Sequence, residues 1–227
     1  MFAAVMPSYD LINRIASLGG DRRWRRKAAK ACLEEKPQRL LDIGCGTGDL
    51  TITLARMAEE GVEITGLDYS LPMLGRARQK ASQLGLGERI RFVHGEATQL
   101  PFPDGHLDCV SISFAFRNLT YQNPLRLPHL AEVNRVLRPG GRYVIVESSQ
   151  PENRVIRALF HLYMHAVART VGSLISGKRS AYRYLAESMS SFYSPKEVRE
   201  MLITAGFGEV DYQPLLFGAV GVHVATK

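Results

Sequence analysis

The chain has 227 residues, of which 45% are hydrophobic and 22% are charged, and its formal net charge is +7. This length supports one domain around a single core and leaves little for a second. The composition predicts a globular, soluble chain. The positive charge favours an anionic partner, which can be nucleic acid, a negatively charged membrane surface or an acidic metabolite.

The cysteines and the apolar runs indicate the cellular compartment of the protein. Cys32, Cys45 and Cys109 show no C-x-x-C spacing, so neither a disulfide framework nor a zinc site is predicted. The opening segment lacks a basic region followed by an apolar one, and Arg or His interrupts every later apolar run before it reaches bilayer length. We expect a reducing, cytoplasmic setting without secretion or a membrane span.

In chain order, a basic helix comes first and alternating strands and helices follow. The pattern from Leu11 to Glu35 is helical, with Trp24 among arginines, and Pro37 ends it. Helical stretches then alternate with the β-rich runs RLLDIG, VEITGLD, RIRFVHG, LDCVSISF and RYVIVES. Repeated βα units predict an α/β fold with a parallel, doubly wound sheet.

The last third of the chain predicts a change of strand direction. In LRPGGRY, Pro139 cannot continue a helix while Gly140 and Gly141 permit positive φ, so we expect a tight turn before the fifth strand. The runs FGEVDYQPL and GAVGVHVAT predict two strands joined by a short turn around Phe217 and Gly218. The sheet is therefore expected to end in an antiparallel pair.

A glycine loop and a following acid predict a nucleoside site. In LLDIGCGTGDL, three glycines stand between a strand and a helix, where a ligand reaches backbone N–H groups at the positive helix end. Asp49 occupies the place of the third glycine of the dinucleotide fingerprint, which disfavours a pyrophosphate. Asp68 closes the next strand, where a carboxylate accepts ribose hydroxyl hydrogens. The alternative is that the glycines only turn the chain and Asp68 caps a helix.

These features resemble the class I S-adenosylmethionine methyltransferases, and further motifs narrow the resemblance to the ubiquinone/menaquinone C-methyltransferase (UbiE/MenG-like) family. The motifs span nearly the whole chain and are YDLINRIASLGGDRRWRR, LDIGCGTGDL, LDYSLPML, LPFPDGHLD, SISFAFRNL, RVLRPGG and YRYLAESM. The resemblance implies a Rossmann-like, mostly parallel seven-stranded sheet with N-terminal helices and a helical lid after the fifth strand. It divides the single domain 1–227 into a helical cap (1–36), a cofactor-binding core (37–150), a lid or substrate element (151–193) and a C-terminal helix with a strand pair (194–227).

The resemblance implies S-adenosylmethionine as cofactor, S-adenosylhomocysteine as product and no metal. The cofactor residues that it implies are Gly44, Gly46, Thr47, Gly48, Asp68, Tyr69, Glu96, Ala97 and Ser113. Without the family, Ser113 would be read as a strand residue with a satisfied hydroxyl. Ala115, Phe116 and Ser148 depart from the family pattern, and we expect them to form apolar walls of the substrate site.

The implied reaction is C-methylation of a polyprenylated quinol ring. We favour demethylmenaquinol as the acceptor; the alternatives are the benzoquinol of ubiquinone biosynthesis, another small apolar acceptor, or RNA. Arg117 and Asn118 follow the fourth strand at the carboxyl edge of the sheet and are the predicted catalytic residues. A guanidinium stays protonated, so Arg117 is expected to stabilise a phenolate, and its alternative role is to donate to loop carbonyls.

Four further side chains are candidate substrate contacts by resemblance. Tyr9 and Asp10 belong to the N-terminal segment, although Asp10 is an equally good helix cap. Tyr182 and Tyr184 lie in YRYLAES, where core packing explains them equally well. The general base is not identified.

The segment 154–176 is nearly apolar, yet Arg157, His161, His165 and Arg169 recur along it every four residues. Residues four apart share one edge of a helix, so we expect a lid with an apolar inner wall and a basic rim that meets anionic lipid. Trp24 is expected to anchor the N-terminal helix to the same surface. The alternative is a helix packed on the core with a solvated basic edge. A metal site at the two histidines is disfavoured because no third ligand is evident.

The expected partners are a polyprenyl quinol and, peripherally, the inner face of the membrane, and a homodimer is left open. Nucleic acid is not expected, because FAFRNL replaces the proline-containing aromatic loop with which base methylases hold a flipped base. A non-catalytic scaffold is disfavoured by the intact glycine loop and Asp68.

Overall fold

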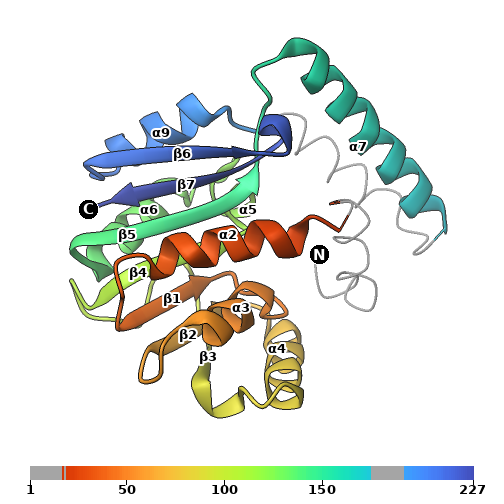
Figure 1. Ribbon diagram of the computed structural model, residues 1–227. Coiled ribbons are helices and arrows are strands. Elements are labelled where there is room, and N and C mark those ends of the chain that lie inside the picture. Colours follow the sequence, from red (N-terminus) through yellow and green to blue (C-terminus); the bar gives the residue numbers. More distant parts are fainter. Residues whose placement is uncertain (1–16, 18, 175–191) are drawn as a thin grey trace.

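A seven-stranded sheet in the order β3-β2-β1-β4-β5-β7-β6 organises the chain (Figure 1). The computed structural model describes residue 17 and residues 19–174 and 192–227. The strands are β1 (Arg39–Ile43), β2 (Glu63–Asp68), β3 (Ile90–His94), β4 (Leu107–Ser113), β5 (Leu137–Ser148), β6 (Glu209–Leu215) and β7 (Val220–Thr226). Strands β1 to β5 pair in parallel, whereas β7 is antiparallel to both β5 and β6. The predicted doubly wound, mostly parallel sheet with an antiparallel end is confirmed.

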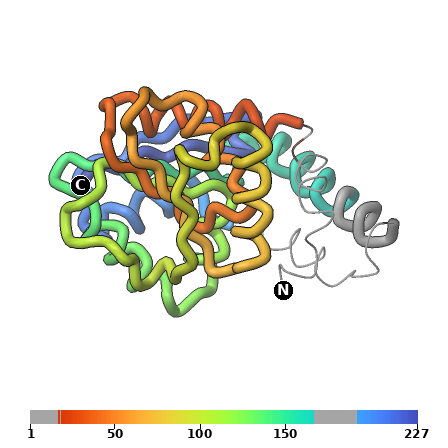
Figure 2. Tube along the Cα trace, turned by 90° about the horizontal axis from the view of Figure 1, so that it is seen from below, coloured from red at the N-terminus to blue at the C-terminus, as the bar shows by residue number. Residues whose placement is uncertain are grey.

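Helices cover both faces of the sheet (Figure 1). The described helices are α2 (Asp21–Leu33), α3 (Asp49–Met57), α4 (Leu71–Gln83), α5 (Phe116–Thr120), α6 (Arg126–Val136), α7 (Arg154–Leu174) and α9 (Pro195–Thr204), with short 3₁₀ turns η3 (Gly87–Arg89) and η4 (Leu216–Gly218). Seen from below, α7 extends away from the layered body (Figure 2). None of the helices in the described part of the chain combines the length and apolar character needed to cross a membrane.

Two apolar cores lie on the two faces of the sheet. Neighbouring residues of a strand point to opposite faces, and accordingly Leu40 packs in the core with α2 and α3 while Leu41 packs in the core with α6 and α9. Because β1 is buried on both sides, four of its five residues are buried, as is usual for a central parallel strand. The carboxyl ends of β1 and β4, where the strand order reverses, lie where such sheets bind ligands.

Two predicted boundaries are wrong. The helix expected from Leu11 to Glu35 begins, in its described part, only at Asp21, after Gly19 with φ 72°, and it ends at Leu33. The turn expected before the fifth strand is instead a register shift within β5, which already pairs with β4 at Leu137. Of the two glycines there, only Gly140 has a positive φ.

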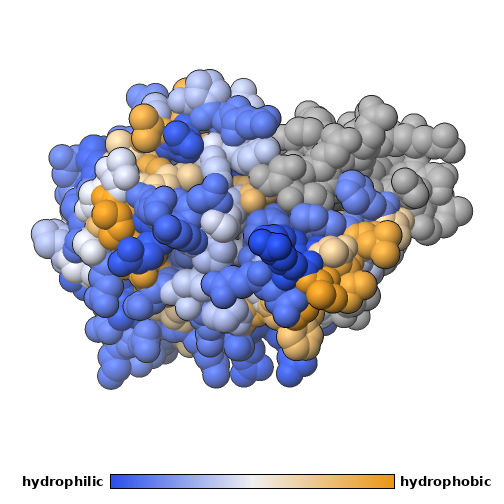
Figure 3. Space-filling model, turned by 90° about the horizontal axis from the view of Figure 1, so that it is seen from above, coloured by the Kyte–Doolittle hydropathy of each residue, from blue (hydrophilic) through white to orange (hydrophobic). Residues whose placement is uncertain are grey.

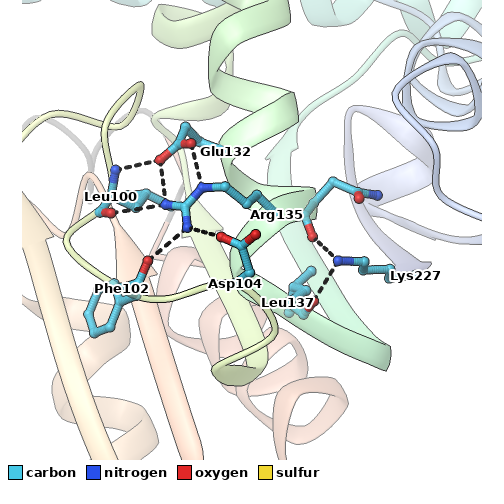
Figure 4. A network of polar contacts seen from close by, with 8 residues as sticks. Leu100, Phe102, Asp104, Glu132, Arg135, Leu137 and Lys227 are labelled. Carbon is cyan, nitrogen blue, oxygen red and sulfur yellow. Dashed lines mark hydrogen bonds and ion pairs between the residues drawn. The ribbon is translucent and has the colours of Figure 1, made fainter.

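The motif LPFPDG (residues 100–105) is held by two side chains of α6 (Figure 4). The Arg135 guanidinium donates to the carbonyl oxygens of Leu100 (3.2 Å) and Phe102 (2.9 Å) and to Asp104 (2.7 Å). Glu132 pairs with Arg135 and accepts from Leu100 N at 2.8 Å. The hydrogen bonds from Arg135 lower the pKa of Glu132. This network fixes the loop entering β4 and lies apart from the cleft described below.

Candidate active site

The glycine loop after β1 is shaped by its backbone angles. Gly44, Gly46 and Gly48 have φ values of 61°, 55° and 81°, in the left-handed region that favours glycine. Gly48 is the N-cap of α3, so the loop delivers backbone N–H groups to a helix N-terminus. A Cβ on Gly46 would meet nothing within 4 Å, whereas one on Gly44 would lie 2.9 Å from the Ala115 Cβ. The loop therefore opens onto free space at Gly46.

Asp68, at the end of β2, is fixed by the same loop. Its Oδ2 accepts from Gly46 N and its Oδ1 accepts from Ser70 N, each at 2.8 Å. A carboxylate oxygen accepts more than one hydrogen bond, so both oxygens retain capacity for ligand hydroxyls. Tyr69 follows, with 70% of its surface exposed and its ring 5.9 Å from that of His94. Asp68 thus couples the glycine loop to the neighbouring strand end.

An open cleft at the carboxyl ends of β1, β2 and β4 unites these features. Its lining comprises Arg25, Asp42, Gly44, Cys45, Gly46, Thr47, Asp49, Leu50, Asp68, Tyr69, Ser70, Met73, Ser113, Phe114, Ala115 and Asn118. Seven of the predicted site residues are therefore together: Gly44, Gly46, Thr47, Asp68, Tyr69, Ser113 and Asn118. The Ser113 Oγ is buried and has no hydrogen-bond partner within the described part of the structure. The reading of Ser113 as a satisfied strand hydroxyl is wrong, and its free hydroxyl suits a ligand in this cleft.

Four predicted residues are not in this lining. Gly48 lies under the loop, where its Cβ would be 3.1 Å from that of Ala77 in α4. Glu96 is exposed and Ala97 half-buried, just beyond the point where Gly95 N donates to Asp68 O at 3.2 Å. Arg117 is buried in α5, directly before Asn118 in the chain.

The position of Arg117 is fixed by a hydrogen bond from its backbone N–H. Its N–H donates to the buried Glu147 carboxylate at 3.2 Å, and its Nε is buried without a partner among the described residues. Phe116 is fully buried in the core, and the buried Ser148 donates its hydroxyl to Glu147 at 2.8 Å. The expectation that Phe116 and Ser148 form walls of the substrate site is therefore wrong, while Ala115 does line the cleft.

Sequence reasoning missed Arg25, which reaches the cleft from α2. The side chain is buried, its Nη1 lies 2.5 Å from Asp21 and 3.7 Å from Asp49, and its guanidinium lies 5.5 Å from the Phe114 ring centre. Basic residues surround this helix in sequence, so charge alone could not single out Arg25. The available signal was its spacing of three, four and seven residues from Ala28, Ala29 and Cys32, which are buried on the same face.

Two aromatic residues stand beside Arg25. Phe114 directly follows β4 with φ 55°, an uncommon conformation for a bulky residue, and such strain gathers at functional sites. Trp24 is half-buried with its ring 6.1 Å from that of Phe114. Trp24 therefore packs partly against Phe114, and its role as a membrane anchor stays a prediction.

The acids of the cleft occupy different environments. Asp42 is buried and accepts from Thr51 Oγ1 at 2.6 Å and Ser111 Oγ at 3.0 Å. Burial raises the pKa of Asp42 to about 6. Asp49 forms an ion pair with Lys80, which also contacts Thr47 Oγ1 at 3.2 Å. Asp42 thus stabilises the inside of the loop, whereas Asp49 keeps a partly exposed charge at the cleft.

The remaining candidates belong either to undescribed segments or to α7. Tyr9, Asp10, Tyr182 and Tyr184 lie outside the described residues. On α7, Val155, Leu159 and Leu162 face solvent, while His161 is half-buried with its Nε2 3.0 Å from Gln150 Oε1. The predicted arrangement of apolar side chains inside and a basic rim outside is wrong for Leu159, Leu162 and His161, whereas His165 is exposed as expected. Within the described residues, no three His, Cys, Asp or Glu side chains gather as metal ligands.

The ubiE/COQ5 methyltransferase family matches the chain over residues 1–227. The chain belongs to this family. The demethylmenaquinone methyltransferase of Thermus thermophilus is 43% identical to this methyltransferase with 100% of both chains covered. That of Deinococcus radiodurans is 44% identical, with 100% of this chain and 91% of the relative covered. The ubiquinone/menaquinone biosynthesis C-methyltransferase UbiE of Geobacter sulfurreducens is 35% identical, with 100% of this chain and 87% of the relative covered.

A solved structure supports the fold of this methyltransferase. The S-adenosylmethionine-dependent methyltransferase from Aquifex aeolicus has a TM-score of 0.62 at 20% identity, over 95% of this chain and 97% of that chain. The family and the fold together confirm the predicted class I methyltransferase and its cofactor, S-adenosylmethionine.

Proposed function

We propose that this methyltransferase methylates a ring carbon of a polyprenylated quinol, with demethylmenaquinol as the preferred acceptor. The observation that carries the proposal is the full-length similarity to two demethylmenaquinone methyltransferases, at 43% and 44% identity. The benzoquinol of ubiquinone biosynthesis is the second candidate, because a relative at 35% identity is named for both pathways.

The cleft residues fit the cofactor. The Asp68 carboxylate would accept from the ribose hydroxyls, and Gly46 and Thr47 would present the loop to the amino-acid half. The unpartnered Ser113 hydroxyl would supply a further hydrogen bond. The other members of the proposed cofactor site are Gly44, Gly48, Tyr69, Glu96 and Ala97. When bound, S-adenosylmethionine supplies an electrophilic methyl group on its sulfonium sulfur.

Arg25 and Asp49 add a charged end to this site. The amino-acid part of the cofactor carries a carboxylate and an ammonium group, and a guanidinium and a carboxylate lie in the same cleft. Arg25 is already oriented by Asp21 and by the face of Phe114, so little conformational freedom would be lost on binding. We assign the cofactor carboxylate to Arg25 and the ammonium group to Asp49.

The acceptor has to be in its reduced form. Loss of a phenolic proton places electron density on the ortho carbon, whereas the oxidised ring is electron-poor. Asn118, in the cleft lining, would orient the ring, and the buried Arg117 would stabilise the phenolate with its guanidinium. Holding carbon, methyl and sulfur in line and excluding water are then the main tasks of the protein. Tyr9, Asp10, Tyr182 and Tyr184 remain proposed substrate contacts.

The decisive experiment offers labelled S-adenosylmethionine with short-tailed demethylmenaquinone and its benzoquinone analogue, each with and without chemical reduction. Label in the reduced naphthoquinol is the expected result, and label in the benzoquinol alone would favour the second candidate. If cofactor binding is demonstrated but no quinol is labelled, the proposed acceptor class is wrong. An RNA acceptor would instead show label in oligonucleotides with steep salt dependence.

We also propose that this reaction takes place at the cytoplasmic, inner face of the membrane. An acceptor with a long apolar tail partitions into the bilayer, and the net charge of +7 favours an anionic surface. The surface that makes this contact is the subject of the following inference.

A further inference from the structure

A stripe of exposed apolar side chains runs along α7. Val155, Leu159 and Leu162 are 68%, 60% and 67% exposed, and their spacing of four and three residues places them on one face of the helix. Figure 3 shows hydrophobic residues gathered as a band over this part of the molecule. An apolar helix face normally packs against a core, so an outward-facing stripe indicates an interaction surface.

The turn between β6 and β7 presents a second apolar group. Phe217 is 80% exposed, the largest exposure among the exposed large hydrophobic residues of the described chain, and the neighbouring Leu216 is 43% exposed. Leu216 and Phe217 have φ values of 45° and 55°, which branched and aromatic residues seldom adopt. Strained backbone thus directs an aromatic ring into solvent. Burial of this ring by a partner would contribute free energy that offsets the cost of the strain and of the exposed apolar surface.

This turn adjoins the start of α7. A Cβ on Gly218 would lie 3.3 Å from Pro151 Cα, so η4 packs on the segment that leads into the helix. Figure 1 likewise places the β6–β7 turn beside the base of α7. The turn and the helix stripe therefore belong to one edge of the molecule, which we call the docking edge: Val155, Leu159, Leu162, Leu216 and Phe217.

The sequence that contains the α7 stripe is rich in basic residues. In the sequence, residues 153–186 contain six Lys and Arg and no Asp or Glu, and Glu152, just before α7, is exposed. Arg154 is exposed at the base of α7, and Arg157 is half-buried one turn further on. Apolar side chains beside basic ones on a projecting helix are typical of segments that lie in the interface of an anionic bilayer.

We propose that the docking edge inserts into the headgroup region of anionic membranes, with the α7 stripe and Phe217 as its two apolar contacts. The inference rests on the proposed function, because it gives an enzyme for a prenylated acceptor direct contact with the membrane that holds the acceptor. It changes the expected arrangement of α7 in part: Leu159 and Leu162 face lipid, and the half-buried His161 faces the body of the protein.

Vesicle sedimentation with the full chain tests the proposal, using phosphatidylcholine alone or mixed with phosphatidylglycerol. Wild type should bind the anionic vesicles more tightly, and less so at high salt. Leu159→Gln and Phe217→Asn should each weaken this binding by about tenfold, because each removes one buried apolar side chain. Leu127→Gln on α6 is the matched control, since Leu127 is also 60% exposed, and it should bind as wild type does.

Phe217→Asn separates docking from folding. Asn adopts the left-handed conformation more readily than Phe, so thermal stability should be unchanged or higher while vesicle binding falls. Binding of the Leu159→Gln/Phe217→Asn double variant at the wild-type level would overturn the proposal. So would a dimer, seen by analytical ultracentrifugation, that these substitutions dissociate without changing vesicle binding.

A water-soluble acceptor distinguishes failure of this inference from failure of the proposed function. The double variant should methylate a short-tailed reduced naphthoquinol in detergent-free solution at the wild-type rate and lose activity only on long-tailed quinol in vesicles. Equal rates of variant and wild type in vesicles would overturn the docking edge alone. No methyl transfer by wild type to any quinol would instead contradict the proposed function.

Discussion

The cofactor cleft and the antiparallel end of the sheet both depend on glycine, but for different physical reasons. Gly46 has φ 55° and a Cβ there would meet nothing within 4 Å, so glycine provides a backbone conformation. Gly221 in β7 needs no unusual φ, but a Cβ would lie 2.2 Å from the Tyr212 ring, so glycine provides room. The cleft is thus specified by local geometry, and the sheet end by contact between two strands.

The largest expected effect tests the cleft. Asp68→Ala removes the acceptor for Gly46 N and Ser70 N together with the proposed ribose contact, so affinity for S-adenosylhomocysteine should fall by about 100-fold or more. Isothermal titration calorimetry measures this, with Asp211→Ala on the exposed side of β6 as control. Affinity within twofold of wild type would show that Asp68 only shapes the loop.

A substitution at the antiparallel end of the sheet should lower the stability of the fold and leave the cofactor affinity unchanged. Gly221→Ala drives a methyl group into the Tyr212 ring and should destabilise the fold by about 2 kcal/mol, as overpacking does. Denaturant unfolding measures the loss. In the Tyr212→Ala background the same substitution should cost much less, because the clashing ring is absent. Additive losses would contradict the steric explanation.

The buried acid of the cleft gives a pH test. Burial raises the pKa of Asp42 to about 6, so the folded state binds this proton more tightly than the unfolded state. The associated stability is present at low pH and is lost as pH rises to about 6. Relative to Asp42→Asn, wild type should lose about 2 kcal/mol between pH 4.5 and pH 8. A constant difference between the two proteins across this range would mean that Asp42 has an ordinary pKa.

Substitution of Arg25 tests whether this side chain binds the amino-acid half of the cofactor or only supports the cleft. Arg25→Gln should lower affinity for S-adenosylhomocysteine by about tenfold and leave affinity for 5′-methylthioadenosine, which lacks the carboxylate, unchanged. Arg22→Gln, an exposed position on the same helix, is the control. Equal losses for both ligands would show that Arg25 supports the cleft without contacting the carboxylate.

The smallest expected effect concerns α9, which packs on β6. The Ser194 hydroxyl and Glu197 form a capping box, and the hydrogen bond from Ser194 lowers the pKa of Glu197. Ser194→Ala should therefore cost about 1 kcal/mol of stability. Ser70→Ala makes the same substitution at an N-cap without a side-chain cap bond and should change stability less. Equal losses would contradict the assigned role of the box.

The sequence alone determined the features that depend on neighbours along the chain. Alternating strand and helix patterns predicted the order of elements, and the loop with Asp68 predicted the cleft, because glycine conformation and strand ends are local properties. The short β-rich runs near the C-terminus likewise predicted β6 and β7. Family resemblance then added Ser113, which periodicity alone would have assigned to a satisfied strand position.

Only the tertiary structure decided which side of an element meets which neighbour. The basic run around Trp24 does not reveal that Arg25 is buried, because several arginines share the helix and burial depends on Asp21, Asp49 and Phe114 meeting there. The apolar pattern of α7 likewise predicts a helix but not which face turns outward. Periodicity records the spacing of side chains around one helix, whereas burial depends on residues that the fold brings from elsewhere in the chain.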